Sequence, residues 1–249
     1  MADAEFWKEA GSAGLLGIDT PVEYGGIGAD FRHCMVAEEE QAYAGADFFG
    51  PGFGLHTNIV MPYLFNYGTE EQKSYYLPDM TSGEVISCIG MTEPSAGSDL
   101  QGIKTVAKRD GDDWIINGSK TFISNGYLST LAVVVAKTDL DKKAAHGTSL
   151  FLVDTRHHKG FQKGKVLKKV GQHTYDTAEL FFEDVRVPSS AILGGDEYMN
   201  KGFYCLMDEL PRNSLKNIFF AKLKTKNKAM IKRTIVDCRS SSLSLRKCI

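Results

Sequence analysis

The sequence lacks any apolar run near the roughly 20 residues that a membrane-spanning helix requires, so no such helix is expected. Its five cysteines lie far apart and form no CxxC pair, which argues against a zinc or dithiol centre and favours a reducing compartment. The acidic N-terminus, Met1-Ala2-Asp3-Ala4-Glu5, has neither the apolar segment of a secretory signal nor the arginines of a transit peptide. With 43% hydrophobic and 24% charged residues among 249, the composition excludes collagen, coiled coil and wholesale disorder.

Glycine and acidic residues become scarce toward the C-terminal end. All 25 glycines precede Pro211, and from there onward eleven basic residues accompany a single acidic one, Asp237, a net charge of +10. The preceding part holds 18 basic and 30 acidic residues, a net charge of −12. Because charge and glycine usage change at one point, we expect the segment after Leu210 to differ in origin from the rest. Nucleic-acid binding by this segment is not favoured, since few aromatic residues interleave with its bases.

The first 84 residues carry the signals of short packed helices. Apolar side chains from Phe6 to Leu16 recur with a 3.6-residue period, and further helical runs cover 34–46 and 56–67. Thr69-Glu70-Glu71-Gln72 is a capping box that opens a fourth helix. We expect this helix to end before Pro78, because proline disfavours the helical conformation of the residue before it.

From Val85 onward, short runs of strand-forming residues alternate with turn signals. Asp110-Gly111 predicts a hairpin, and Asn117-Gly118 and Asn125-Gly126 bound the next run, 120–124. Further strands are expected over 131–137, 149–154, 177–182 and 183–187. No βαβ alternation exists, so the predicted class is α+β, with a helical domain followed by an antiparallel barrel or sandwich rather than a Rossmann or TIM architecture.

Most catalytic signatures are absent. No HExxH, GxxxxGK[ST] or GxSxG motif occurs, so neither a metal centre, a P-loop nor a hydrolase elbow is predicted. The informative stretch is Ile89–Asp99, in which hydroxyls and small residues surround one proline. Such a loop lets backbone amides approach a flat or anionic ligand, and Thr92 and Ser98 add donors. From this chemistry alone, a ligand-binding loop and a plain polar loop both remain open.

Several segments of the chain, in order, resemble the flavin-binding middle domain of acyl-CoA dehydrogenases, with the long-chain branch most similar. They are Met91-Thr92-Glu93-Pro94, Ala96-Gly97-Ser98-Asp99, Gly102-Ile103-Lys104-Thr105, 114–120 and Phe122-Ile123-Ser124-Asn125-Gly126. Glu23-Tyr24-Gly25-Gly26 and 68–73 resemble the family's N-terminal helical domain, and 183–188 resembles the close of its β-domain. The likeness covers about residues 6 to 211.

The resemblance implies three parts: an N-terminal helical domain over 1–84, a flavin-binding β-domain over 85–195, and from 196 to 249 the start of a C-terminal helical domain followed by the unrelated basic segment. It implies FAD as cofactor and α,β-dehydrogenation of fatty acyl-CoA in fatty acid β-oxidation. It also implies an electron-transfer flavoprotein as electron acceptor, a homotetramer, and the mitochondrial matrix as location. An acyl-CoA oxidase of the same architecture and a non-catalytic fragment that pairs with full-length subunits are the alternatives.

The same resemblance implies which residues would contact ligands. Thr92 would donate to the polar edge of the flavin ring, and Ser124 would lie near its N5 atom. The implied flavin-contacting residues are Ile89, Gly90, Met91, Thr92, Glu93, Pro94, Ser95, Ala96, Gly97, Ser98, Phe122, Ile123 and Ser124. The implied substrate-contacting residues are Ser98, Ala145, His146 and Tyr204. No metal ligand is implied.

Two positions depart from the family pattern. Ser95 stands where the family usually has glycine, which would cost on the order of 1 kcal/mol if the backbone there needs a positive φ. Asn213 stands at the position of the catalytic glutamate, and an amide cannot accept a proton at neutral pH, so no catalytic residue is assigned. Glu209, about one helical turn away, is expected to be a solvated residue. We therefore expect a change of reading frame or splice pattern after Pro211, a helical bundle that is largely absent, and impaired dehydrogenation.

Overall fold

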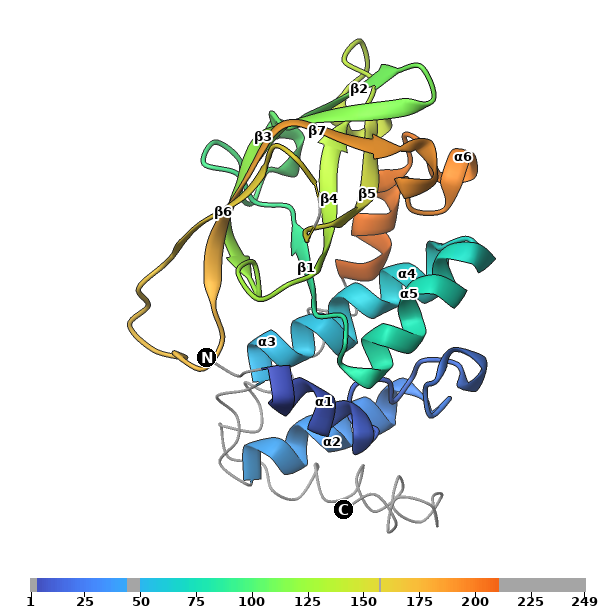
Figure 1. Ribbon diagram of the computed structural model, residues 1–249, viewed down its shortest axis with the longest axis vertical. Helices are drawn as coiled ribbons and strands as arrows, with labels where there is room; N and C mark the ends of the chain where they lie inside the picture. The colour runs from blue at the N-terminus through green and yellow to red at the C-terminus, as the bar shows by residue number, and fades with distance from the viewer. Residues whose placement is uncertain (1–3, 44–49, 157, 211–249) are drawn as a thin grey trace.

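The computed structural model describes residues 4–43, 50–156 and 158–210, which divide into a helical part and a curled β-sheet (Figure 1). The helices are α1 (Ala4–Ser12), α2 (Phe31–Tyr43), α3 (Gly50–Gly54), α4 (Met61–Tyr67), α5 (Glu70–Ser82) and α6 (Gly195–Tyr198). The strands are β1 (Ser87–Gly90), β2 (Val106–Asp110), β3 (Asp113–Ser124), β4 (Leu131–Lys137), β5 (Thr148–Asp154), β6 (Phe161–Val166) and β7 (Thr177–Pro188). A further helical stretch covers residues 202–210. In Figure 1, α1 to α5 lie together at one end of the molecule and the sheet lies at the other.

Helix α5 continues past Pro78, so the expectation that it ends before this residue is wrong. It ends at Ser82, after which Gly83 takes a left-handed φ of 81°. Leu77 and Met80 on the last turns are fully buried, and burying such a side chain contributes roughly 2 kcal/mol. This burial offsets the backbone hydrogen bond that proline cannot donate.

The strands form one curled sheet, so the expected α+β class is confirmed. Within the described residues the sheet has seven strands in the order β1-β4-β2-β3-β7-β6, with β5 beside β4. Most neighbours are antiparallel, but β1 and β2 pair with β4 in parallel, so the sheet is mixed rather than wholly antiparallel. A parallel pair needs a long connection between its strands, and the β2–β3 hairpin lies inside the connection from β1 to β4.

Strand β3 runs through the Asn117-Gly118 dipeptide, so the expected turn there is wrong. The pairing with β7 shifts register between Ile116 and Gly118, and Gly118 has a φ of 150°. A Cβ on Gly118 would lie 2.5 Å from Oγ1 of Thr105. The glycine therefore marks a β-bulge with close backbone approach, not a turn. The hairpin expected at Asp110-Gly111 is confirmed, with Gly111 at a φ of 63°.

Strands β6 and β7 differ from expectation. The runs 177–182 and 183–187 form the single strand β7. The sequence does not predict β6, because its residues, FQKGKV, lack apolar alternation. Its pairing with β7, from Phe161 opposite Phe182 to Val166 opposite Ala178, holds it in the sheet.

Strands β4 and β5 are buried on both faces, which joins the two parts of the molecule. Because successive side chains of a strand point to opposite faces, alternate residues enter two different apolar cores. Those in the core shared with α4 and α5 are Leu131, Val133, Val135, Leu150 and Leu152. Those in the core inside the β-domain are Ala132, Val134, Ala136, Phe151 and Val153. The continuous apolar run over 131–136 is therefore the pattern of a strand covered on both faces.

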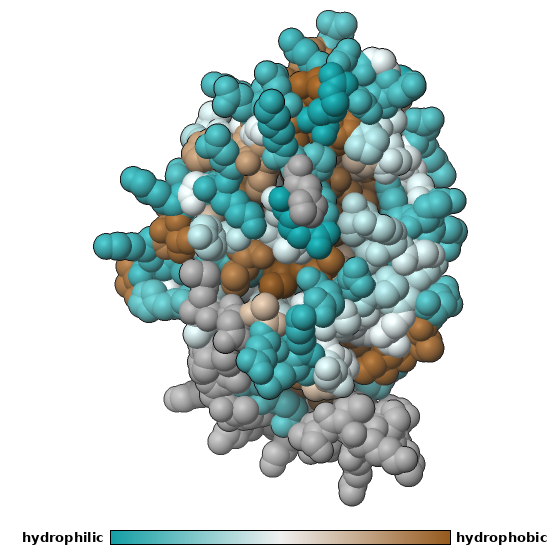
Figure 2. All heavy atoms as spheres, viewed as in Figure 1, coloured by the Kyte–Doolittle hydropathy of each residue, from teal (hydrophilic) through white to brown (hydrophobic). Residues whose placement is uncertain are grey.

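Large apolar residues that reach the surface are scattered over separate segments. Val22, Tyr75, Phe122, Leu140 and Val170 are each more than half exposed. On the face shown in Figure 2, apolar side chains surface in separate patches with polar side chains between them. Single exposed apolar residues are common in folded proteins.

The side chain of Gln72 ties the helical part to the β-domain. The capping box is confirmed, because the Gln72 amide N–H donates to Oγ1 of Thr69 at 3.2 Å and Oε1 of Gln72 accepts from the Thr69 amide at 3.1 Å. The same Oε1 accepts from the Gly194 amide at 3.0 Å. Nε2 donates to the carbonyls of Ser190 and Ile192 at 2.8 and 2.7 Å. All hydrogen-bonding positions of this buried amide are thus filled.

We expect Gln72→Glu to lower the free energy of unfolding by about 3 kcal/mol, because a carboxylate would face two carbonyl oxygens without a proton to donate. Urea unfolding followed by circular dichroism measures the loss. Gln162→Glu, on the exposed side of β6, is the matched control and should change the value by less than about 0.5 kcal/mol. Equal effects of the two substitutions would contradict this role for Gln72.

His56 is a fully buried neutral histidine in the π-helical segment Leu55–Val60. Its Nδ1 accepts from the Ser87 amide at 3.1 Å, so Nδ1 carries no proton, and Nε2 donates to the Met80 carbonyl at 3.0 Å. Burial lowers the pKa of His56 to about 4, although the Met80 carbonyl opposes the shift. Trp7 packs edge-on against the ring, with centroids 5.3 Å apart.

We expect the protein to lose stability as the pH falls below 6.5, because between pH 6.5 and about 4 the unfolded state binds a proton at His56 that the folded state does not. From pH 7 to pH 5 this single group should account for about 2 kcal/mol. Urea unfolding of His56→Gln over this range should lack that loss, whereas His173→Gln, at an exposed histidine, should retain it. Parallel pH curves for the native protein and His56→Gln would refute the assignment.

Candidate functional site

The polar loop from Met91 to Ser98 leaves the end of β1 and folds against β3. The Thr121 amide on β3 donates to the Thr92 carbonyl at 2.9 Å. A tight turn over Pro94 and Ser95 is closed by two backbone hydrogen bonds between Glu93 and Ala96, of 2.8 and 3.1 Å. Glu93 and Ala96 are buried, and the residues between and beyond them are exposed. The loop therefore has an anchored inner side and an open outer side.

Glu93 anchors the loop by an ion pair in the interior. Its Oε1 lies 2.8 Å from Nζ of Lys120, whose side chain is fully buried, and also accepts from the Thr105 amide at 3.0 Å. Its Oε2 accepts from the Lys104 amide at 2.5 Å. Burial lowers the pKa of Lys120 to about 8, although Glu93 opposes the shift. Burial alone would raise the pKa of Glu93, but the Lys120 ammonium and the amide donors hold it below its ordinary value.

Phe122 stands next to this loop in an uncommon backbone conformation. Its φ is 58°, and the residue is 68% exposed. The β3–β7 pairing shifts register between Lys120 and Ile123, so Phe122 sits in a β-bulge. A left-handed conformation costs a residue with a Cβ roughly 1–2 kcal/mol. Such strain is often found where a side chain is aimed at a ligand.

The residues predicted to contact the flavin come together, but they do not all face outward. The side chains of Ile89 and Ile123 are buried in the two apolar cores, Gly90 is buried beside Lys120, and Glu93 turns inward to its ion pair. Of the remaining residues, Pro94, Ser95, Gly97, Ser98 and Phe122 are exposed, and Thr92 and Ser124 are half-buried. We call these seven residues the cradle. Met91 packs against the apolar core shared with α4 and α5, and Ala96 is buried.

The cradle fits a flat ligand with polar edges. A Cβ on Gly97 would meet no protein atom within 4 Å, so a ligand has room to approach the backbone there. Hydroxyls of Thr92 and Ser98 supply donors, and the exposed Phe122 ring supplies an apolar wall. Ser95 has no positive φ, so the expected strain at this position does not arise.

A second feature, a cavity of about 560 Å³, unites three of the predicted substrate residues. It lies between the 3₁₀ turn Ala144–His146 and the helical stretch 202–210. Its lining consists of Ala145, His146, Tyr198, Asn200, Lys201, Phe203, Tyr204 and Met207. Gly202 lets the helix approach β5 closely, since a Cβ there would lie 2.9 Å from the backbone of Ser149. Ser98 does not line the cavity, although the 3₁₀ turn that follows it, Leu100–Gly102, contacts the 3₁₀ turn Ala144–His146.

Sequence reasoning missed five of the cavity-lining residues and Lys120. Tyr198 to Phe203 carry no motif, and only the chain path around α6 brings them beside Ala145. Lys120 gives a weak signal, since it shares the inward side of β3 with Trp114 and Ile116. A lysine at an inward position indicates a buried partner.

None of the described residues that line the cavity carries a carboxylate. Glu209 is 4% exposed, and its Oε1 accepts from Nδ2 of Asn66 at 2.6 Å. The expectation of a solvated Glu209 is therefore wrong, because the residue faces α4 rather than solvent or the cavity. Asn213 and the basic segment after Leu210 lie outside the described residues.

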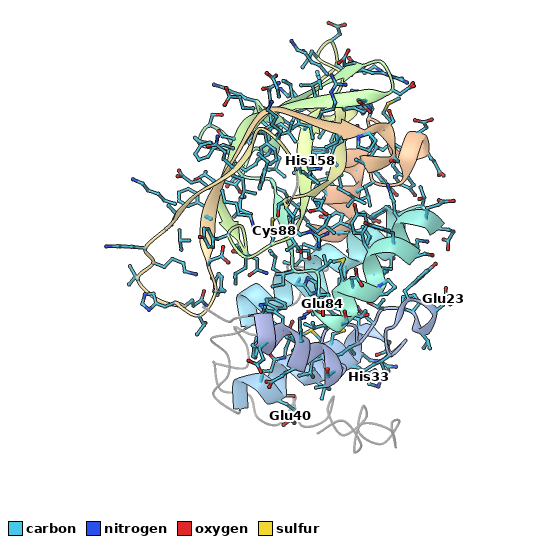
Figure 3. All side chains as sticks on the ribbon, in the orientation of Figure 1. Glu23, His33, Glu40, Glu84, Cys88 and His158 are labelled. Carbon is cyan, nitrogen blue, oxygen red and sulfur yellow. The ribbon has the colours of Figure 1, made fainter. Side chains whose placement is uncertain are left out.

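Titratable side chains are dispersed over the molecule. Figure 3 shows Glu23, His33 and Glu40 in the helical part, whereas Cys88 and His158 lie in the β-domain. Among residues 4–43, 50–156 and 158–210, no group of histidine, cysteine and acidic side chains is arranged to hold a metal ion. No helix of this described part has the length and apolar character needed to cross a bilayer.

A helical domain followed by a curled β-domain is consistent with the N-terminal and middle domains of acyl-CoA dehydrogenases. Residues 1–84 match the family profile described as acyl-CoA dehydrogenase, N-terminal domain, and residues 88–185 match acyl-CoA dehydrogenase, middle domain. The chain belongs to the acyl-CoA dehydrogenase family.

Similar proteins agree with this membership. The long-chain specific acyl-CoA dehydrogenase of Rattus norvegicus is 57% identical over 212 residues, which are 85% of this chain and 48% of that protein. The isovaleryl-CoA dehydrogenase of Pongo abelii is 42% identical over 83% of this chain and 48% of its own length. A crystal structure of the Geobacillus kaustophilus acyl-CoA dehydrogenase superposes with a TM-score of 0.82 at 45% identity, covering 88% of this chain and 56% of that one. The chain thus spans about half the length of the curated relatives it matches.

We expect Phe122→Gly to raise the free energy of unfolding by about 0.5 kcal/mol, because glycine relieves a left-handed strain that exceeds its own entropic cost. Thermal or urea unfolding measures the change. Phe181→Gly, at another partly exposed aromatic residue of the sheet whose φ is not positive, should instead destabilise the protein by about 1 kcal/mol. Destabilisation of similar size in both variants would show that the Phe122 backbone is not strained.

Proposed function

We propose that this chain binds FAD in the cradle. The observation that carries the proposal is the open space at the exposed Gly97, in the loop that also holds Thr92 and Ser98. Phe122 is exposed on β3, and its neighbour Thr121 donates to the Thr92 carbonyl of this loop. Thr92 and Ser98 would donate hydrogen bonds to polar edges of the cofactor. Phe122 and Ser124 would lie beside the flavin ring. When bound, FAD would supply the hydride-accepting chemistry, and the protein would supply orientation and polar contacts.

We further propose a fatty acyl-CoA as the ligand of the cavity at Ala145, His146 and Tyr204. Its volume lies in the range of small-molecule sites. Phe203, Tyr204 and Met207 offer an apolar wall for an acyl chain, while His146 and Lys201 offer polar donors. Ser98 would contact the same substrate from the cradle side, where the two 3₁₀ turns meet.

The activity proposed for the family domains is α,β-dehydrogenation of fatty acyl-CoA, with electrons passing to an electron-transfer flavoprotein in the mitochondrial matrix. Relatives with mitochondrial names and a similar structure titled for an electron transferring flavoprotein of Acidaminococcus fermentans support this assignment. In this chain the reaction would be impaired. The resemblance to the family puts Asn213 at the position of its catalytic glutamate, and Glu209 is engaged with Asn66. Removing an α-proton requires a base within hydrogen-bonding reach of the substrate.

The test is a titration of the purified full chain with FAD, followed by visible absorbance and calorimetry. We expect a yellow complex whose flavin spectrum shifts when palmitoyl-CoA is added, and dye reduction that stays near background. Absence of any heat or spectral change with FAD would sink the cofactor assignment.

Ala145→Trp tests the cavity in the same assay. The indole would fill space beside His146, so we expect at least a tenfold weaker response to palmitoyl-CoA with unchanged FAD binding. Leu140→Trp, at an exposed residue outside the cavity, should leave both responses intact. A normal palmitoyl-CoA response in Ala145→Trp would place the acyl-CoA elsewhere.

A further inference from the structure

We propose that Glu93 and Lys120 are positioning residues, a buried ion pair that sets the conformation of the Met91–Ser98 loop for cofactor binding without contacting the cofactor. This inference rests on the FAD-binding function proposed above and names the residues that hold the cradle loop on its buried side.

Glu93 lies at the turn of the loop and also reaches into the interior. Its backbone closes the turn over Pro94 and Ser95 by two hydrogen bonds with Ala96. Its side chain points the opposite way, into the interior, where it is 5% exposed. The same residue therefore forms the turn with its backbone and anchors it in the interior with its carboxylate.

The Glu93 carboxylate contacts several segments of the chain. It joins three segments that are separate in sequence: the loop itself, the amides of Lys104 and Thr105, and Lys120 on β3. Lys120 also places its Nζ 3.4 Å from the Met91 carbonyl, at the start of the loop. The loop is thus held at both Met91 and Glu93, while Thr92 between them keeps its hydroxyl free of any protein partner among the interactions described.

Burying the Glu93–Lys120 ion pair has an energetic cost. Desolvating two charges is expensive, and apolar residues of similar volume often stabilise a fold equally well. An apolar pair, however, offers no directed acceptor for the two amides and no donor for the Met91 carbonyl. Unlike apolar packing, the ion pair makes directed contacts. We therefore expect its loss to change ligand affinity more than the free energy of unfolding.

Three variants separate positioning from simple stability. Glu93→Gln keeps the shape but removes the charge, Lys120→Met leaves the carboxylate without its ammonium, and the double variant Glu93→Gln/Lys120→Met removes both charges. Each is measured by FAD titration, by thermal unfolding, and by hydrogen exchange of the Lys104, Thr105 and Thr121 amides in the cofactor-free chain.

We expect Glu93→Gln to weaken FAD binding on the order of tenfold and to speed exchange of the Thr121 amide, which donates to the Thr92 carbonyl. Each single variant should lower the melting temperature, since it leaves one charge of the pair buried without its partner. The double variant should recover the melting temperature but not the FAD affinity. Glu84→Gln, in the exposed pair with Lys8 at 2.6 Å, is the matched control and should change neither.

Two results would overturn the inference. One is an FAD affinity of Glu93→Gln within twofold of the native chain. The other is recovery of both melting temperature and affinity in the double variant, which would assign the pair a stabilising role only. If the native chain itself fails to bind FAD, the proposed function fails. The exchange data then decide the inference, because an unchanged Thr121 rate in Glu93→Gln overturns it and a faster rate supports the anchoring of the loop.

Discussion

The structure depends on the two-sided burial of β4 and β5. One face of this strand pair packs on α4 and α5, and the other closes the interior of the β-domain. Exposing either face to water would remove several large apolar side chains from the core. Burial of each contributes roughly 2 kcal/mol to the free energy of unfolding. The helical part and the β-domain are therefore two sides of one packing arrangement, although they are consecutive in sequence.

Polar side chains give this apolar arrangement its fixed geometry. Gln72 uses three hydrogen bonds of its side-chain amide to hold residues 190–194 against the start of α5. His56 links α5 to β1 through the Met80 carbonyl and the Ser87 amide. Glu93 and Lys120 do the same for the loop after β1. Apolar burial alone is non-directional, so these contacts decide which loop conformation accompanies the packed core.

The candidate site is built on this frame in two parts. The cradle follows directly from β1 and β3, whereas the cavity needs the 3₁₀ turn Ala144–His146 and the helical stretch 202–210 to meet across β5. The contact between the two 3₁₀ turns connects them. The FAD and acyl-CoA proposed above would then lie in neighbouring parts of the molecule.

The sequence by itself determined the α+β class, the capping box at Thr69, the hairpin at Gly111 and the family likeness, because these rest on local periodicity, turn chemistry and short motifs. Only the tertiary structure decided that α5 passes through Pro78, that β3 passes through Gly118, and that Glu93 and Glu209 turn inward. The reason is that burial and pairing with distant segments outweigh local preferences, and no local pattern states which side of a loop will face the core.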